Sequence, residues 1–115
     1  NDKEFLIWGS GNPLREFLHV DDLAKAIDTI IKSDTSESLI NVGSSEEITI
    51  KELAKEIKLI VGYEGDLNFD SSKPDGNPRK LLDSTKINQL GWHPEIDLKS
   101  GLKNTYKWFV DNSEL

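Results

Sequence analysis

The sequence contains no cysteine, so disulfide bonds, thiolate metal sites and a cysteine nucleophile are all excluded within its 115 residues. No apolar run approaches the roughly 18 residues that a membrane-spanning helix needs, and the first residues show no signal-peptide pattern. The absence of cysteine fits a cytoplasmic protein. The net charge of −7 and the pI near 4.8 argue against nonspecific binding to nucleic acid.

The usual catalytic and metal-binding sets of residues are lacking too. His19 and His93 lie far apart in the sequence, and His19 is expected to pack at the start of a helix. The adjacent acids Asp21 and Asp22 look like a helix N-terminus rather than an acid/base pair, and no calcium-loop pattern occurs. We therefore expect neither a metal site nor a catalytic residue in this chain.

Arginine is scarce, with only Arg15 and Arg79 against twelve lysines. A guanidinium is the better bidentate partner for phosphate or carboxylate, so each arginine is a candidate ligand contact. Arg15 closely follows Trp8 and a Gly-Ser-Gly turn. Two interpretations of Arg15 stay open, namely contact with a ligand phosphate or pairing with Glu16 or Asp21. Trp8 either offers a flat face for stacking or is a core residue at the end of a strand.

The segment Ser71–Lys80 (SSKPDGNPRK) combines two prolines, one glycine and three cations. Prolines restrict the backbone, which would reduce the entropy lost if these cations converge on an anion. The alternative is a solvated basic loop. We predict that this segment and the stretch Trp8–Asp22 are two halves of one site.

Short apolar segments rich in β-formers predict strands. Buried strands are expected at Phe5–Trp8 and Leu39–Gly43, a further short strand at 67–69, and a brief extended piece at 81–82. Strands this short cannot form a large sheet by themselves. The chain therefore has the character of a piece that packs onto something larger.

Four segments show helical periodicity together with a capping residue. These helices are expected to begin at residues 21–22, 49, 83–84 and 97. The second has a capping box between Thr49 and Glu52 and a stop at Gly62. Gly101 lies inside the last helix, where we expect it to allow close approach of another backbone. The fold class is therefore mixed α/β, with about four helices and three or four short strands.

The string REFLHVDD (15–22) resembles the substrate-domain signature of extended short-chain dehydrogenases/reductases that act on nucleotide sugars. The longer set of WGSGNPLREFLHVDDLA, INVG, FDSSKPDGNPRKLLD, QLGW and GLKNTYKWF is similar, almost end to end, to the C-terminal part of the GDP-L-fucose synthase family. Its most discriminating part is KPDGNPRKLLD. The resemblance implies an NADPH-dependent enzyme that converts GDP-4-dehydro-6-deoxy-D-mannose to GDP-L-fucose by 3,5-epimerisation and 4-reduction, with residues 1–115 as its substrate-binding domain.

The same resemblance implies site residues. Trp8 and Arg15 match substrate-binding positions, with Arg15 expected near the GDP pyrophosphate, and Lys80 matches a residue that lines the GDP-sugar site. Asp66 takes a position where the family tends to place a basic residue near the nucleotide. An acid beside a diphosphate is unfavourable, so Asp66 either loses this contact or turns away.

The catalytic part that the resemblance implies is missing from this sequence. Neither Tyr63 nor Tyr106 is followed by a lysine four residues later, and no glycine-rich NADP motif occurs. The NADPH-binding Rossmann portion is expected upstream of Asn1, the intact enzyme is expected to be a homodimer, and this chain alone is expected to be inactive. Two alternatives stay open: the same domain of another nucleotide-sugar epimerase or dehydratase, and a non-catalytic folding or interaction module.

Overall fold

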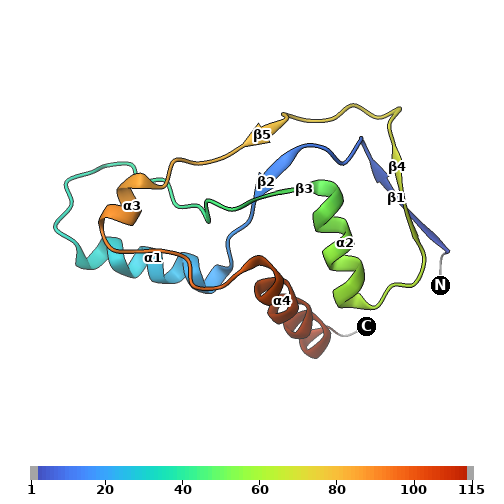
Figure 1. Cartoon of the computed structure of the whole chain (residues 1–115). Coiled ribbons are helices and arrows are strands. Elements are labelled where there is room, and N and C mark those ends of the chain that lie inside the picture. The colour runs from blue at the N-terminus through green and yellow to red at the C-terminus, as the bar shows by residue number, and fades with distance from the viewer. Residues whose placement is uncertain (1–2, 114–115) are drawn as a thin grey trace.

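The computed structural model of the protein describes residues 3–113, which form four helices and five short strands in an open, elongated shape (Figure 1). The helices are α1 (Val20–Lys32), α2 (Ile50–Val61), α3 (Thr85–Gln89) and α4 (Leu98–Asn112). The strands are β1 (Glu4–Trp8), β2 (Leu14–Glu16), β3 (Glu47–Thr49), β4 (Asp66–Asp70) and β5 (Arg79–Lys80). The predicted mixed α/β class is confirmed.

The strands form two small sheets. β1 and β4 pair in parallel, with Glu4 opposite Asp66 and Trp8 opposite Asp70. In the second sheet β2 lies between β3, to which it is antiparallel, and β5, to which it is parallel. Because β1 and β2 are each paired with a strand more than 50 residues later, the loop between β4 and β5 returns alongside the turn between β1 and β2.

Two of the strand predictions need correction. Residues 39–43 form no strand within the described part of the chain, and Leu39 is exposed. Only Ile40 and Val42 of this segment pack against the core, and the Gly43 N–H donates to the Ser84 hydroxyl at 2.9 Å instead of to a neighbouring strand. β1 is a strand as predicted, but it is not buried, since most of its side chains are exposed. An apolar segment is more stable when it is buried, but the described residues do not cover β1.

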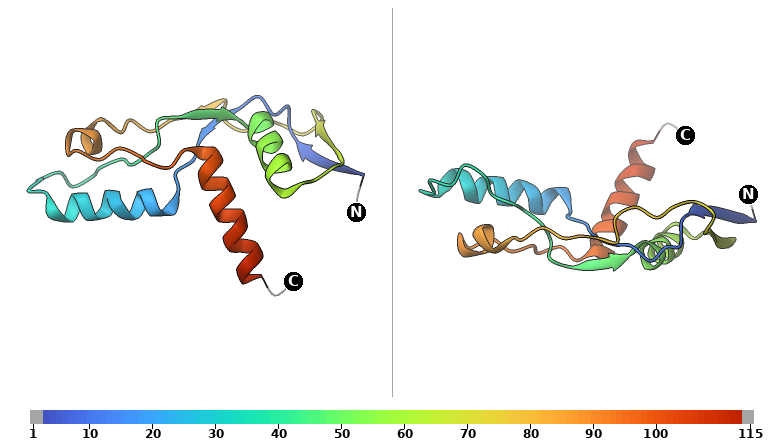
Figure 2. Two further views of the ribbon diagram at one scale, coloured as in Figure 1. Left: turned by 60° about the horizontal axis from the view of Figure 1, so that its bottom comes forward. Right: turned by 90° about the horizontal axis from the view of Figure 1, so that it is seen from above.

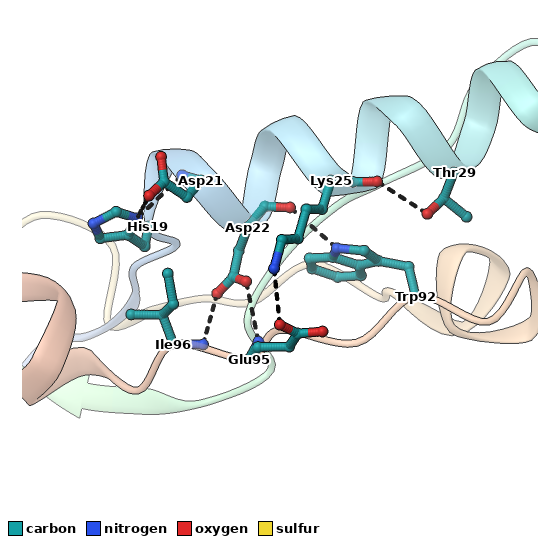
Figure 3. Close-up of polar contacts among 8 residues, drawn as sticks. All are labelled: His19, Asp21, Asp22, Lys25, Thr29, Trp92, Glu95 and Ile96. Carbon is teal, nitrogen blue, oxygen red and sulfur yellow. Dashed lines mark hydrogen bonds and ion pairs between the residues drawn. The ribbon is translucent and has the colours of Figure 1, made fainter.

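The start of α1 also differs from the prediction. His19, not Asp21 or Asp22, is the N-cap, because its Nδ1 atom accepts a hydrogen bond from the Asp21 backbone N–H at 3.0 Å (Figure 3). This geometry confirms that His19 packs at the start of the helix. Asp22 is instead fully buried, where its carboxylate accepts the backbone N–H groups of Glu95 and Ile96 at 3.1 and 3.0 Å. Asp22 therefore connects α1 to the segment before α4.

The capping predictions for α2 are confirmed. The Thr49 hydroxyl accepts the Glu52 N–H at 3.1 Å, and the Glu52 carboxylate accepts the Thr49 N–H at 3.4 Å. These reciprocal bonds satisfy two backbone donors that the first helical turn leaves without partners. The helix ends at Gly62, whose φ of 72° is in the left-handed region that glycine adopts without a Cβ penalty.

Asp97 caps helix α4, as predicted, but the explanation for Gly101 changes. A Cβ atom built on Gly101 would lie 3.2 Å from Cδ2 of His19 and 3.5 Å from Cγ2 of Ile96. The close neighbours are thus side chains and not another backbone. Gly101 lets α4 pack against the residue that caps α1.

The cap of α4 predicts a pH effect. The pKa of Asp97 is held below its usual range, first by the Ser100 backbone N–H at 2.8 Å and then by the Ser100 hydroxyl. A carboxyl with a depressed pKa stabilises the fold above its unfolded-state pKa of about 3.9, and this contribution is lost as the pH falls through the lower folded-state value. We expect wild type to be more stable than Asp97→Asn at pH 7 and this difference to shrink below about pH 4, as measured by urea unfolding. A difference that grows towards low pH would contradict the assignment.

The core is small and lies at one end of the molecule. It consists of Ala26, Ile87 and Trp92, with half-buried neighbours from α1, α3 and the segments beside them. The radius of gyration is 17.1 Å, whereas a compact domain of 115 residues is expected to have about 13 Å. The flat, extended arrangement is visible from two further directions in Figure 2. The described residues therefore enclose much less apolar surface than their number permits.

Apolar faces that the periodicity predicts are formed but not covered. On α1, Leu23, Ile27 and Ile31 follow one another along one side, and all three are exposed. On α4, Trp108 and Phe109 are also exposed. The described residues therefore leave these apolar faces uncovered. No helix in the range 3–113 is long and apolar enough to cross a membrane.

Candidate functional site

The turn after β1 brings the chain back towards β2. Trp8 ends β1, and the Gly9 N–H donates to the Asp70 carbonyl at 2.9 Å, which continues the pairing of β1 with β4 by one residue. Gly9 and Gly11 both have positive φ, at 95° and 80°, a conformation that other L-residues rarely adopt. The backbone of the turn therefore favours glycine at both of these positions.

The loop of residues 71–78 is attached directly to this turn. The Asp75 carboxylate accepts the Ser10 backbone N–H at 2.8 Å and the Ser10 hydroxyl at 2.6 Å. The Ser10 hydroxyl, and then its N–H, hold the pKa of Asp75 below its usual range. Two segments that are 65 residues apart in the sequence thus meet through one serine and one aspartate.

Arg15 makes the second connection between the two segments. Its Nη1 atom donates to the Leu14 carbonyl and to the Asn77 carbonyl, each at 2.7 Å. The predicted alternative, a pairing with Glu16 or Asp21, is not found among the described residues, where Glu16 instead accepts the backbone N–H groups of Ser45 and Leu82. The Nη2 and Nε donors of Arg15 form no hydrogen bond within residues 3–113, so they remain available for a ligand.

The register of the three-stranded sheet separates the two arginines. Arg15 on β2 is opposite Lys80 on β5, and partners in register point to the same face of a sheet. Arg79, one residue earlier, points to the other face, where its guanidinium forms a two-contact ion pair with the Glu47 carboxylate. The Lys80 ammonium makes no hydrogen bond or ion pair with residues 3–113. One face of this sheet therefore carries two cations without an acidic partner.

Trp8 is not a core residue, because 71% of it is exposed. The Lys73 ammonium lies over its ring, 5.1 Å from the ring centroid, in a cation–π contact. Within residues 3–113, Trp8 therefore belongs to no core. The ring stands at the edge of the loop, where it offers an accessible aromatic surface.

Asp66 lies apart from these residues. It is the first residue of β4 and pairs with Glu4, whereas Trp8 is opposite Asp70, four residues further along. At about 3.3 Å per residue, this separation along the strand is roughly 13 Å. The structure places Trp8 and Arg15 beside the loop of residues 71–78, with Lys80 on the strand that follows it, but leaves Asp66 at the far end of the β1–β4 pair.

The structure adds two contacts that the sequence did not predict. Asp75 binds Ser10, and Lys73 lies over the ring of Trp8. A proline followed by Asp-Gly marks a turn, and that signal was visible, but it does not reveal that the carboxylate contacts Ser10. Within residues 3–113 no three His, Cys, Asp or Glu side chains are grouped to hold a metal ion.

Residues 1–43 match the NAD dependent epimerase/dehydratase family. The chain is 55% identical over 112 residues to a protein named probable GDP-L-fucose synthase 1 from Oryza sativa subsp. japonica, which covers 97% of this chain and 34% of the relative. It is 49% identical to GDP-L-fucose synthase of Escherichia coli (strain K12), over 99% of this chain and 38% of that protein. A crystal structure of a GDP-L-fucose synthetase from Naegleria fowleri bound to NADP superposes with a TM-score of 0.89 at 32% identity, over 96% of this chain and 36% of that one.

The chain is therefore similar to part of the NAD dependent epimerase/dehydratase proteins, through residues 1–43 and through its fold. Three relatives at 49–55% identity are named GDP-L-fucose synthase, one of them as probable. The chain spans about a third of the length of the curated relatives that it matches.

Proposed function

We propose that this chain is the GDP-sugar-binding part of an NADPH-dependent GDP-L-fucose synthase, which converts GDP-4-dehydro-6-deoxy-D-mannose to GDP-L-fucose by 3,5-epimerisation and 4-reduction. The observation that carries the proposal is the register of Arg15 opposite Lys80 on one face of a sheet. Two cations in this arrangement, without an acid to neutralise them, suit a diphosphate. The homology to GDP-L-fucose synthases supplies the identity of the nucleotide sugar.

Each residue of the site has a separate proposed role. The Arg15 guanidinium contacts the diphosphate through its Nη2 and Nε donors, and the Lys80 ammonium adds a second positive charge beside it. The exposed Trp8 ring forms a wall of the pocket against which a flat group packs. Asp66 stays a predicted substrate position on the family resemblance alone, since its place at the start of β4 gives it no part in the Arg15–Lys80 group.

The residues of this chain do not fit NADPH. A dinucleotide pyrophosphate binds a glycine-rich turn that leads directly into a helix N-terminus. Here the Ser10 N–H of the Gly-Ser-Gly turn already donates to the Asp75 carboxylate, and α1 begins only at Val20. We propose that NADPH and the proton-transferring residues belong to the part of the enzyme that this chain does not span, and that the intact enzyme is a cytoplasmic homodimer.

The test is GDP and GDP-sugar affinity of the full-length enzyme, measured by titration calorimetry. A hydrogen bond to a charged group contributes about 1.5–3 kcal/mol, so we expect Arg15→Ala and Lys80→Ala each to weaken binding by about tenfold or more. Arg79→Ala is the matched control, because Arg79 lies next to Lys80 but on the opposite face, paired with Glu47. Its affinity should stay within about threefold of wild type.

Unchanged affinity in both Arg15→Ala and Lys80→Ala would remove the basis for the diphosphate site. An equal loss in Arg79→Ala would show that the sheet, and not the face that carries Arg15, determines binding. Product analysis with GDP-4-dehydro-6-deoxy-D-mannose and NADPH tests the reaction itself. Another product from this substrate would assign the chain to a different nucleotide-sugar enzyme of the same class.

A further inference from the structure

Glu16 ends β2 and directly follows Arg15. Its half-buried carboxylate holds the backbone on both sides of the strand, since it accepts the N–H of Ser45 and the N–H of Leu82, each at 2.9 Å. We propose that Glu16 is a positioning residue, which fixes the strand that carries Lys80 against the strand that carries Arg15 and so raises the affinity for a diphosphate. The inference rests on the proposed function, because it concerns how the Arg15–Lys80 pair is held.

The attachment of β5 to β2 is very short. β5 has two residues, and Arg79 and Lys80 are its only positions in register with β2. Both residues are exposed, so no packing against a core fixes them. Beyond Lys80 the strand pairing ends, and the Leu82 N–H donates to Oε1 of Glu16 in place of a β2 carbonyl. Because hydrogen bonds to a charged acceptor are the stronger ones, this bond extends the attachment of β5 past Lys80.

The same carboxylate also fixes the other neighbour of β2. β3 begins at Glu47, which is opposite Glu16, and Ser45 lies two residues before it. Ser45 has a φ of 63°, a conformation that residues other than glycine seldom adopt. The bond from its N–H to Oε2 of Glu16 stabilises this turn. Glu16 therefore connects all three strands of the sheet at the end where their pairing stops.

Gly43 shows that the Glu16 carboxylate lies in a confined place. A Cβ atom on Gly43 would lie 2.8 Å from both Cδ and Oε2 of Glu16 and still closer to Oε1, which is nearer than real Cβ atoms come. The backbone of Gly43 is itself buried and held, because its N–H donates to the Ser84 hydroxyl at 2.9 Å. The flexible end of the Glu16 side chain would therefore have to move. Gly43→Ala thus displaces the carboxylate without removing its charge.

Charge distinguishes positioning from a direct electrostatic effect. A carboxylate beside Arg15 repels a diphosphate, so the loss of the Glu16 charge alone would strengthen binding. If Glu16 holds Lys80 in place, its removal weakens binding instead. The Arg79–Glu47 ion pair also links β5 with β3, but it joins two side chains, and the Arg79 side chain is 60% exposed. An exposed ion pair contributes little, so it does not replace the bonds that Glu16 makes to the backbone.

The test measures two properties of the full-length enzyme, namely GDP affinity by titration calorimetry and amide hydrogen exchange in peptides that cover residues 79–84. We expect Glu16→Ala to weaken GDP binding by about fivefold, less than Lys80→Ala, because only the placement of the ammonium is lost. Exchange in these peptides should become at least about fivefold faster. Glu16→Gln keeps one acceptor oxygen for two N–H donors, so its affinity should be intermediate. Gly43→Ala should weaken GDP binding by about threefold or more.

Coupling to Lys80 distinguishes positioning from general stabilisation. In a Lys80→Ala background, Glu16→Ala should change GDP affinity by less than about twofold, whereas a general loss of stability would act equally in both backgrounds. Glu46→Ala is the matched control. Glu46 is an exposed acid just before β3, and its carboxylate forms no hydrogen bond or ion pair within residues 3–113. Both measurements should stay within about twofold of wild type in this variant.

Each outcome supports or overturns the role of Glu16. Unchanged or tighter GDP binding in Glu16→Ala, beside a loss in Lys80→Ala, would overturn it and leave the diphosphate site intact. Wild-type exchange, or an equal loss of affinity in the Lys80→Ala background, would also overturn it, since Glu16 would then not act through β5. If Glu16→Ala fails to fold, wild-type affinity in both Glu16→Gln and Gly43→Ala would overturn it. No GDP binding by wild type would overturn the proposed function and this role together.

Discussion

Replacing Asp22 with alanine is expected to lower the free energy of unfolding by about 3 kcal/mol, because two hydrogen bonds to a buried charged group are lost together. Asp22 is fully buried, and its two carboxylate oxygens accept the backbone N–H groups of Glu95 and Ile96 (Figure 3). These bonds join the first turn of α1 to the segment that leads into α4. Alanine would leave both N–H groups without their acceptor. Urea unfolding at neutral pH measures the change.

The neighbouring residue provides the control. The Asp21 side chain is 72% exposed and also lies in the first turn of α1, so Asp21→Ala removes a charge of the same sign from the same helix end. Its effect should stay below about 1 kcal/mol. Asp22→Asn should lie between the two, since one oxygen acceptor is kept and one is replaced by a donor. Equal losses for Asp21→Ala and Asp22→Ala would show that the buried bonds contribute nothing specific.

Asp22 also illustrates where sequence reasoning fails. An acid just before an apolar helix pattern predicts a cap, and both Asp21 and Asp22 fit that pattern. The structure uses His19 as the cap instead and turns Asp22 towards residues more than 70 positions later. Local rules locate the start of α1 to within two residues, but they cannot distinguish an acid that faces solvent from one that accepts distant backbone donors.

The junction of the two segments was the better-founded prediction. The backbone preferences of glycine and proline, and the charge of arginine, can be argued from the residue type alone. Their concentration in residues 8–22 and 71–80 predicted one site, and the contacts of Ser10 and Arg15 with the later segment confirm that the segments meet. The partners within the junction could not be predicted, because register between strands far apart in sequence depends on the whole fold.

The buried strand predicted at 39–43 failed for a related reason. An apolar segment indicates that burial is favourable, but it does not say which surface provides that burial. Leu39 and the exposed apolar side chains of β1 and α1 are uncovered among residues 3–113. The chain spans about a third of its relatives' length, which agrees with apolar faces that have no partner here.

Replacing Trp92 with alanine is expected to have the largest effect on stability, a loss of about 4 kcal/mol. Trp92 is 4% exposed and packs with Ala26 and Ile87 in the small core. Its indole N–H also donates to the Asp22 carbonyl at 3.0 Å (Figure 3). Truncation would leave a cavity in a core that has few other members and would remove the indole donor to the Asp22 carbonyl. Thermal and urea unfolding measure the loss.

Trp108→Ala is the matched control, because this tryptophan is 65% exposed and its removal opens no cavity. Its cost should be below about 1 kcal/mol. Trp92→Phe keeps most of the buried apolar surface and loses the N–H donor, so it should cost about 1–2 kcal/mol. The core of α1 and α3 lies at the opposite end of the molecule from β1 and β4 (Figure 1), so Trp92→Phe should bind GDP with wild-type affinity. A loss of affinity in a variant that remains folded would mean that the core helps to position the binding site. The two ends of the molecule would then be structurally coupled.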